Sequence, residues 1–291
     1  MSNAWLVVGA RGQLGRDLVA TLQMRGESVT AVGRAEMDLT VEGSVRGGVR
    51  SWLDDVRHDR AVVVNAAAYT AVDAAETDEA TALLVNGYAP GWIAEEIAGR
   101  GRLLHVSTDY VFDGEATEPY PVDAPVAPRS AYGRTKAAGE KAVAAVGGDA
   151  SVVRTAWVYG RHGGNFVATM SRLETERDTV SVVADQVGCP TWSADLAEGL
   201  IALGVAGEAP PVLHWTNTGQ VSWHGLAQAV FQELGADPSR VLATTSAEFL
   251  RPAPRPAWSV LDGSAWEAAG LPSRRGWREA LGAAMEQGFR S

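Results

Sequence analysis

The chain has 291 residues, a length that predicts either one large domain or two lobes. Its formal net charge of −10 argues against a general nucleic-acid binder and against a membrane-surface protein. Any anionic ligand must therefore be bound locally, by backbone N–H groups or by individual arginines.

The first half of the chain alternates short β-branched runs with longer amphipathic stretches. The runs are apolar almost throughout, as expected of strands buried on both faces, and predict strands at 4–10, 28–34, 61–67, 102–108 and 150–158. The stretches between them predict helices at 12–25, 41–54, 76–100 and 131–146. This alternation implies right-handed crossovers and a parallel, doubly wound sheet.

Beyond residue 158 the alternation is less regular. We expect strands at 179–186 and 212–217, an extended proline-rich loop at 248–262, and helices at 165–177, 194–205 and 223–235. Ser193 and Ser222 are the predicted N-caps of the last two helices. The sequence thus predicts an α/β fold in two parts. Residues 1–158 form the first, with strands near 179–184 and 212–217 added to its sheet, and a smaller lobe is built mainly from 159–291.

The N-terminal sequence and the cysteine count set the expected compartment and exclude two kinds of site. "MSNAWLVVGARG" lacks a basic segment, and its apolar run stops after five residues, too few for a signal peptide or a membrane span. No later segment reaches spanning length, so we expect a cytoplasmic protein. Cys189 is the only cysteine, which excludes an intramolecular disulfide and a cysteine-based metal site.

A glycine-rich turn lies between the first predicted strand and the first predicted helix. "GARGQLG" spaces three glycines so that the chain can turn tightly, approach a pyrophosphate and pack the helix closely on the strand. The orphan N–H groups of the following helix can then bind the phosphates. The predicted cofactor-binding residues of this turn are Gly9, Arg11, Gly12, Gln13, Leu14 and Gly15.

Arg34 ends the second predicted strand, where NAD-binding proteins usually place a carboxylate for the ribose 2′-OH. Together with Arg11 it favours a 2′-phosphate, and therefore NADPH, although NADH is also compatible and Arg34 could instead be a solvated charge. Asp38 and Leu39 suit a contact with the adenine edge. The small side chains of Ala66, Ala67 and Ala68 would let a cofactor lie against the backbone.

Tyr132 and Lys136 are four residues apart, on one face of a predicted helix, in a chain that contains only two lysines. A nearby ammonium favours a phenolate, so we expect Lys136 to lower the pKa of Tyr132 toward the working range. An exposed pair on a solvated helix is the alternative. Thr108 argues against it, because this residue ends a strand where a doubly wound sheet binds ligands. We therefore predict Thr108, Tyr132 and Lys136 as catalytic residues.

Several segments resemble, in order, the landmarks of the dTDP-4-dehydrorhamnose reductase family of extended short-chain dehydrogenases/reductases. They are "GARGQLG", "NAAAYTAVDAAE", "HVSTDYVFDG", "YGRTKAAGE", "VVRTAWVYG", "NFVATMSRL", "DQVGCPT" and "RPAPRPAWSVLD". The resemblance covers essentially the whole chain. It implies a Rossmann-type fold with a C-terminal substrate-binding lobe, and NADPH-dependent reduction of the C4 keto group of dTDP-4-dehydro-6-deoxy-L-mannose to dTDP-L-rhamnose.

The resemblance also implies roles for individual residues. Tyr132 would donate the proton, Lys136 would hold the nicotinamide ribose, and Thr108 would orient the tyrosine. The implied substrate-binding residues are Thr108, Asp109, Trp157, Asn165, Gln186 and Arg255. Trp157 could instead pack between the lobes, and Arg255 could be a solvated loop charge. A homodimer is compatible with the family, and we assign no metal ligands.

The sequence argues against some other functions of the same superfamily and leaves others open. Nucleotide-sugar dehydratases carry a glutamate two residues after the catalytic threonine, where this chain has Tyr110. Epimerases retain NAD and usually have an acidic residue where Arg34 lies. A 4-ketoreductase for another dTDP-deoxysugar would share every motif, and a non-catalytic NADP-binding regulatory subunit would share the fold.

Overall fold

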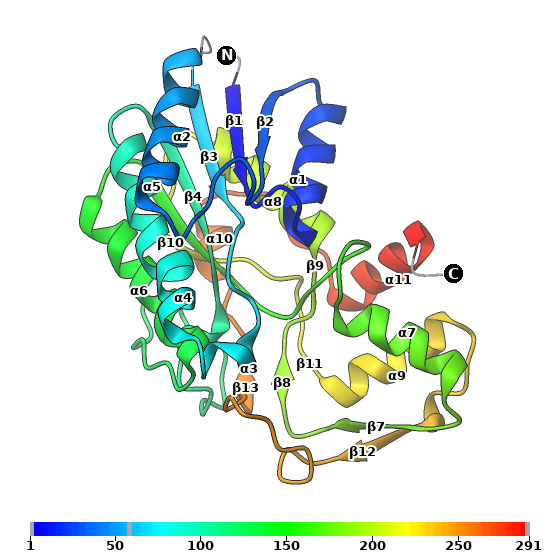
Figure 1. Ribbon diagram of the computed structural model, residues 1–291. Helices are drawn as coiled ribbons and strands as arrows, with labels where there is room; N and C mark the ends of the chain where they lie inside the picture. Colours follow the sequence, from blue (N-terminus) through cyan, green and yellow to red (C-terminus); the bar gives the residue numbers. More distant parts are fainter. Residues whose placement is uncertain (1–2, 57–59, 289–291) are drawn as a thin grey trace.

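A six-stranded parallel sheet forms the centre of the molecule, as the computed structural model of residues 3–56 and 60–288 shows (Figure 1). The strand order is β10-β5-β4-β3-β1-β2, the doubly wound arrangement of a Rossmann-type fold. The strands are β1 (Asn3–Val8), β2 (Ser28–Val32), β3 (Arg60–Asn65), β4 (Gly101–Thr108), β5 (Ala150–Thr155) and β10 (Val212–His214). All of them run parallel, so their carboxyl ends meet at one edge.

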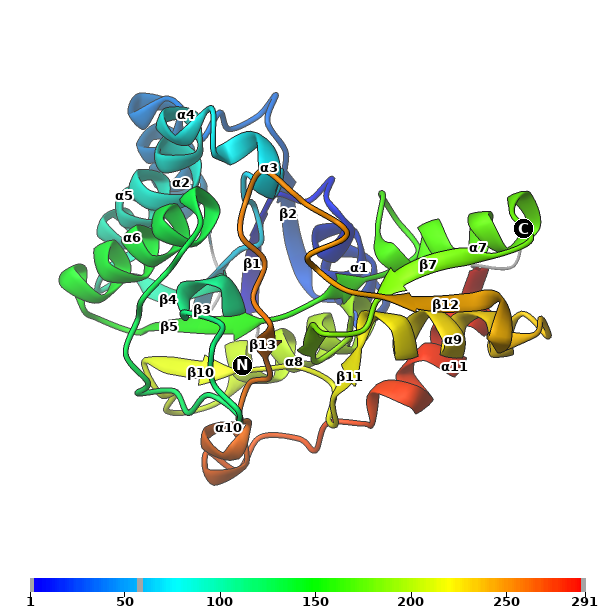
Figure 2. The same cartoon turned by 90° about the horizontal axis from the view of Figure 1, so that it is seen from below.

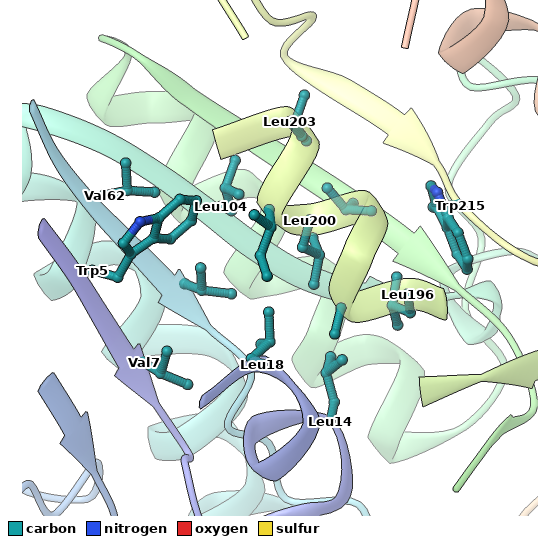
Figure 3. Packing of buried hydrophobic residues seen from close by; sticks show 14 of the residues in the cluster. Trp5, Val7, Leu14, Leu18, Val62, Leu104, Leu196, Leu200, Leu203 and Trp215 are labelled. Carbon is teal, nitrogen blue, oxygen red and sulfur yellow. The ribbon is translucent and has the colours of Figure 1, made fainter. Parts of the chain in front are cut away.

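Helices cover both faces of this sheet. One face carries α2 (Glu42–Asp55), α5 (Ala89–Ile97) and α6 (Ala131–Val146), and the other carries α1 (Gln13–Met24), α8 (Ser193–Val205) and α10 (Ser264–Ala268). Figure 3 shows the core on the second face, in which Leu18 of α1 and Leu200 of α8 pack against the strands. The fully buried Trp5 of β1 belongs to the same core. A Cβ at Gly204 would come within 2.2 Å of the Trp5 ring, so this glycine lets α8 approach the sheet.

The helix predicted at 76–100 is present over residues 79–97, but it is not a regular α-helix throughout. After the separate short helix α3 (Val72–Ala75), the chain forms α4 (Glu79–Leu83), a π-helical turn, η1 (Leu84–Tyr88), and α5 without a break. Asn86 in that turn is buried and bonds to the backbone N and O of Tyr69 and to Thr135 Oγ1. These tertiary hydrogen bonds account for the irregular turn, because π-helical turns commonly occur where a side chain serves a special contact.

The C-terminal lobe contains three helices around its own apolar core, α7 (Phe166–Glu176), α9 (Trp223–Glu233) and α11 (Trp277–Gly288). Short strands complete it, namely β6 (Val158–Tyr159), β7 (Val180–Val183), β8 (Val187–Gly188), β9 (Thr191–Trp192), β11 (Val221–Ser222), β12 (Val241–Thr244) and β13 (Trp258–Ser259). The 3₁₀ turns are η2 (Asp109–Val111) and η3 (Pro238–Arg240). Within the described residues, none of the helices is both long and apolar enough to cross a membrane.

The strand expected near 179–184 was wrongly assigned to the central sheet. It corresponds to β7, which pairs with β12 in a separate two-stranded sheet. Val180 and Val182 bury their side chains in the core of the C-terminal lobe. The strand is therefore apolar because it packs against this core, and not because it belongs to the central sheet. The strand expected at 212–217 is the shorter β10, which does pair with β5.

The two predicted helix caps differ in outcome. Ser222 caps α9 by accepting a hydrogen bond from the Gly225 N–H at 3.1 Å. Ser193 is not a cap, because it is the first residue of α8 and its hydroxyl donates to Asp17 in α1. This serine therefore joins two neighbouring helices.

Candidate active site

A cleft of about 870 Å³ opens at the carboxyl ends of the central strands, beside the C-terminal lobe. This is the edge at which doubly wound sheets bind their ligands. Most of the predicted site residues line it: Gly9, Arg11, Gly12, Gln13, Leu14, Arg34, Asp38, Leu39, Ala66, Ala67, Ala68, Thr108, Asp109, Tyr132, Lys136 and Trp157. Gly15, Asn165, Gln186 and Arg255 are not among its lining residues.

The glycine turn forms a cradle for an anionic group at the first end of the cleft. Gly9 has a φ of +83°, and a Cβ on it would lie 2.7 Å from the backbone of Ala67. Gly12 is the N-cap of α1, which receives no side-chain cap and has no acidic residue in its first turn. The orphan N–H groups therefore suit a pyrophosphate. Gly15 serves packing, since a Cβ there would come within 2.2 Å of Gly9 O.

Arg11 of the glycine turn and Arg34 both lie near the end of β2, but their side chains have different partners. Arg11 forms an ion pair with Glu36, whose carboxylate also accepts from the Gly33 N–H at 2.8 Å. Arg34 is exposed, and its positive charge acts on the nearby Asp38 carboxylate, whose pKa it helps to lower. Sequence reasoning missed Glu36, because nothing in the order of residues shows that it pairs with Arg11. Arg34 is thus the cation with the greater freedom to bind a phosphate.

Asp38 and Leu39 lie beyond Arg34 on the same side of the cleft. The Asp38 carboxylate accepts from the Thr40 N–H at 2.9 Å and from the Thr40 hydroxyl at 2.7 Å. These two bonds lower the pKa of Asp38, so the group is an anion whose acceptors are already partly used. Leu39 is buried and offers an apolar surface.

Helix α6 presents Tyr132 and Lys136 to the cleft from successive turns. Ser130 caps this helix by accepting from the Gly133 N–H at 3.1 Å, which places Tyr132 in the first turn. Lys136 is only 1% exposed, and its Nζ donates to the carbonyl oxygen of Val106 at 2.7 Å. Thr108 ends β4 beside them, so the predicted catalytic residues do converge on one cavity.

The predicted effect of Lys136 on Tyr132 is wrong. Burial is the main influence on Tyr132 and raises its pKa, the negative charge of Asp109 raises it further, and a hydrogen bond with Thr108 opposes both. Burial also lowers the pKa of Lys136 to about 8, against the opposing influence of Glu140. The phenol is therefore neutral at ordinary pH, and the lysine is the group that titrates near the working range.

Asp109 lies between the tyrosine and the C-terminal lobe. Its Oδ1 accepts from the Thr108 hydroxyl at 2.8 Å, whereas its buried Oδ2 has no hydrogen-bond partner in the described part of the chain. Burial raises the pKa of this carboxyl to about 6. An unpaired buried acceptor is costly unless a ligand completes it, so Asp109 suits a substrate hydroxyl.

Trp157 and Trp223 form a stacked pair on the wall of the cleft. Their ring centroids are 3.5 Å apart, with an interplanar angle of 8°. Trp157 has a φ of +48°, a strained conformation for a bulky residue that often marks a functional site. Sequence reasoning missed Trp223, because in sequence it is only the first residue of a capped helix.

The remaining predicted substrate-binding residues have structural partners. Asn165 caps α7 and donates to Gln13 Oε1 at 3.0 Å, which links the lobe to the glycine turn. Gln186 donates to Ser246 Oγ at 2.8 Å. Arg255 pairs with Asp73 of α3 at 2.9 Å, although its buried Nη1 has no partner among the described residues. Figure 2 shows the loop between β12 and β13 reaching α3 at this point.

Comparisons with known proteins place this chain in a family. The model of the RmlD substrate binding domain matches residues 3–289. A dTDP-4-dehydrorhamnose reductase of Streptomyces griseus is 53% identical over 283 residues, 95% of this chain and 91% of that protein. A probable dTDP-4,6-dihydroxy-2-methyloxan-3-one 4-ketoreductase of Streptomyces antibioticus is 50% identical over 279 residues, 95% of this chain and 92% of that protein.

The fold agrees with a solved structure as well. A dTDP-4-dehydrorhamnose reductase from Bacillus anthracis in complex with NADP superimposes with a TM-score of 0.89 at 32% identity, covering 99% of this chain and 100% of the other. The chain therefore belongs to the dTDP-4-dehydrorhamnose reductase family of extended short-chain dehydrogenases/reductases, and it is an NAD(P)H-dependent oxidoreductase of that type.

Proposed function

We propose that this protein reduces the C4 keto group of dTDP-4-dehydro-6-deoxy-L-mannose to give dTDP-L-rhamnose, with NADPH as the reductant. The observation that carries the proposal is the convergence of Thr108, Tyr132 and Lys136 on the cleft that also holds the glycine cradle. The Streptomyces griseus reductase and the NADP complex of the Bacillus anthracis reductase support the substrate and the cofactor.

The cradle would bind the cofactor pyrophosphate with the N–H groups at the start of α1, and Arg34 would bind the 2′-phosphate. When bound, the nicotinamide supplies the hydride. Lys136 would bind the adjoining ribose. At the other end of the cleft, Asp109 would accept from a sugar hydroxyl, and the stacked Trp157 and Trp223 would pack against the nucleotide sugar.

Tyr132 would donate a proton to the C4 oxygen as negative charge develops there. Burial keeps this phenol protonated, which is the form that a proton donor requires. Thr108 would orient it by turning its hydroxyl proton from Asp109 Oδ1 to the phenol oxygen, a hydrogen bond that lowers the pKa of Tyr132 and leaves the phenol proton free for the sugar. Lys136 would then deliver the replacement proton.

A second candidate shares this chemistry and differs only in the sugar. The Streptomyces antibioticus 4-ketoreductase is nearly as similar to this chain as the Streptomyces griseus protein, so the same site could reduce another dTDP-4-keto-deoxysugar. Oxidation of NADPH should be measured with dTDP-4-keto-L-rhamnose and with dTDP-4-keto-6-deoxy-D-glucose, and the products identified by NMR. A higher kcat/KM for the first supports our proposal, and a higher value for the second favours the alternative.

Arg34 provides a prediction about the cofactor. Removing its charge with Arg34→Ala should raise the KM for NADPH about 10- to 100-fold, because a charge-assisted hydrogen bond contributes about 1.5–3 kcal/mol. The KM for NADH should change less than about twofold. Arg172→Ala, which removes an exposed arginine of α7, is the control. An equal rise for both cofactors would show that Arg34 does not bind the 2′-phosphate.

A further inference from the structure

Two buried polar residues, His105 and Asn65, connect the lysine of the active site to the alanine segment that lines the cleft. Asn65, His105 and Lys136 are 0%, 0% and 1% exposed. Lys136 Nζ lies 3.4 Å from His105 Nε2, and His105 Nδ1 lies 3.2 Å from Asn65 Nδ2. Asn65 Oδ1 in turn accepts from the Ala67 N–H at 3.3 Å. These contacts form one continuous path from α6, across β4 and β3, to the cleft.

The backbone N–H of Ala67 determines the direction of the hydrogen bonds along this path. Because an N–H can only donate, the side-chain oxygen of Asn65 must face Ala67 and its NH₂ group must face His105. His105 Nδ1 therefore accepts. A neutral imidazole carries one proton, so that proton lies on Nε2, the nitrogen nearest to Lys136. Burial and the charge of Lys136 lower the pKa of His105 well below its usual value, so the ring is neutral.

This tautomer affects the two protonation states of Lys136 differently. A neutral amine donates to Val106 O and accepts from the Nε2–H of His105, which satisfies both contacts. An ammonium donates to Val106 O but meets a second donor at His105. The charged group that acts on Lys136 is Glu140, one turn along α6, whose negative charge favours the ammonium. Arg154 of β5 holds Glu140 in an ion pair. Tyr132, one turn before it, is a neutral phenol.

We propose that Asn65 and His105 are positioning residues that act through Lys136, holding it beside a fixed hydrogen-bond donor so that its ammonium releases a proton readily. This inference rests on the proposed function. After Tyr132 has given its proton to the C4 oxygen, Lys136 would give one toward the phenolate and become an amine. The His105 Nε2–H would then donate to the lone pair of that amine until solvent returns a proton.

The position of the histidine proton can be measured directly. In the wild-type protein labelled with ¹⁵N-histidine, the ring nitrogens of His105 should show the shifts of the Nε2–H tautomer from pH 6 to 8. Finding the Nδ1–H tautomer would overturn the proposal. The signal is assigned with His105→Gln or, if this variant does not fold, by replacing the other four histidines one at a time. Neither sugar nor cofactor is needed, so a failure here is distinct from a failure of the reductase assignment.

The consequence for the lysine is measurable because the chain has only Lys136 and Lys141. With ¹³Cε-labelled lysine, Lys136 of the wild type should titrate near pH 8, and the exposed Lys141 serves as the internal control. Asn65→Asp keeps an acceptor for Ala67 but reverses the histidine tautomer, whereas Asn65→Leu removes the donor without adding charge. Both should raise the Lys136 pKa, the first by about one unit or more. An unchanged Lys136 pKa, or a rise in the Asp variant alone, would overturn the proposal.

Discussion

Tyr132→Phe is expected to lower kcat for reduction of the sugar about 10²- to 10⁴-fold, the usual contribution of a positioned proton donor. The substitution removes one oxygen from a buried ring and leaves the glycine cradle intact, so the dissociation constant of NADPH should change less than about twofold. Steady-state kinetics would give kcat, and quenching of tryptophan fluorescence would give the cofactor affinity.

Tyr110→Phe is the matched control. The Tyr110 ring packs edge-on against Tyr132 with 5.5 Å between centroids, and burial raises its pKa as well. Because we assign it no proton transfer, its loss of hydroxyl should lower kcat less than about tenfold. If the two variants were equally active, Tyr132 would not be the proton donor. Retention of biological activity by Tyr132→Phe would in addition favour a regulatory protein that binds NADP without catalysis.

Arg154→Met is expected to destabilise the fold by about 3–5 kcal/mol, because it leaves the buried carboxylate of Glu140 without its partner. Arg154 and Glu140 are 4% and 8% exposed and are joined by a bond of 2.7 Å. Ser107 also donates to this carboxylate, and Arg154 Nη1 donates to Val122 O at 3.0 Å. Urea denaturation would measure the change in the free energy of unfolding.

The exposed pair of Arg172 and Glu176 on α7 provides the comparison. Arg172→Met should cost less than about 1 kcal/mol, as expected of a surface ion pair. The double variant Arg154→Met with Glu140→Leu should be less destabilised than the sum of its single variants, since no unpaired charge remains. A cost for Arg154→Met as small as that for Arg172→Met would show that the buried pair contributes little.

The sequence predicted the elements that depend on local pattern. The strands from β1 to β5 were expected from continuous β-branched runs, and the structure places each within a few residues of the expected range. The helix expected at 76–100 is present, but its π-helical turn was not predicted, because the contacts of Asn86 with Tyr69 and Thr135 join residues that are distant in sequence. The strand that became β7 was assigned to the wrong sheet for a related reason, since an apolar run does not show which of two cores will bury it.

Some features of the candidate site were likewise predicted from the sequence, and others were not. The spacing of Tyr132 and Lys136 and the position of Thr108 at a strand end were enough to predict that the three would meet. Electrostatics could not be predicted from spacing, because the pKa of Tyr132 depends mainly on burial and on Asp109. Glu36, His105 and Trp223 were missed, since each acts through a contact that only the folded chain creates.

Transfer of a deuterium label is the most direct test of the proposed reaction. The enzyme would be mixed with dTDP-4-keto-L-rhamnose and NADPH carrying deuterium at the transferable nicotinamide C4 position, and the product analysed by NMR. Our account predicts dTDP-L-rhamnose with deuterium bonded to sugar C4. A product that lacks the label at C4, or a folded enzyme that leaves both reactants unchanged, would contradict it.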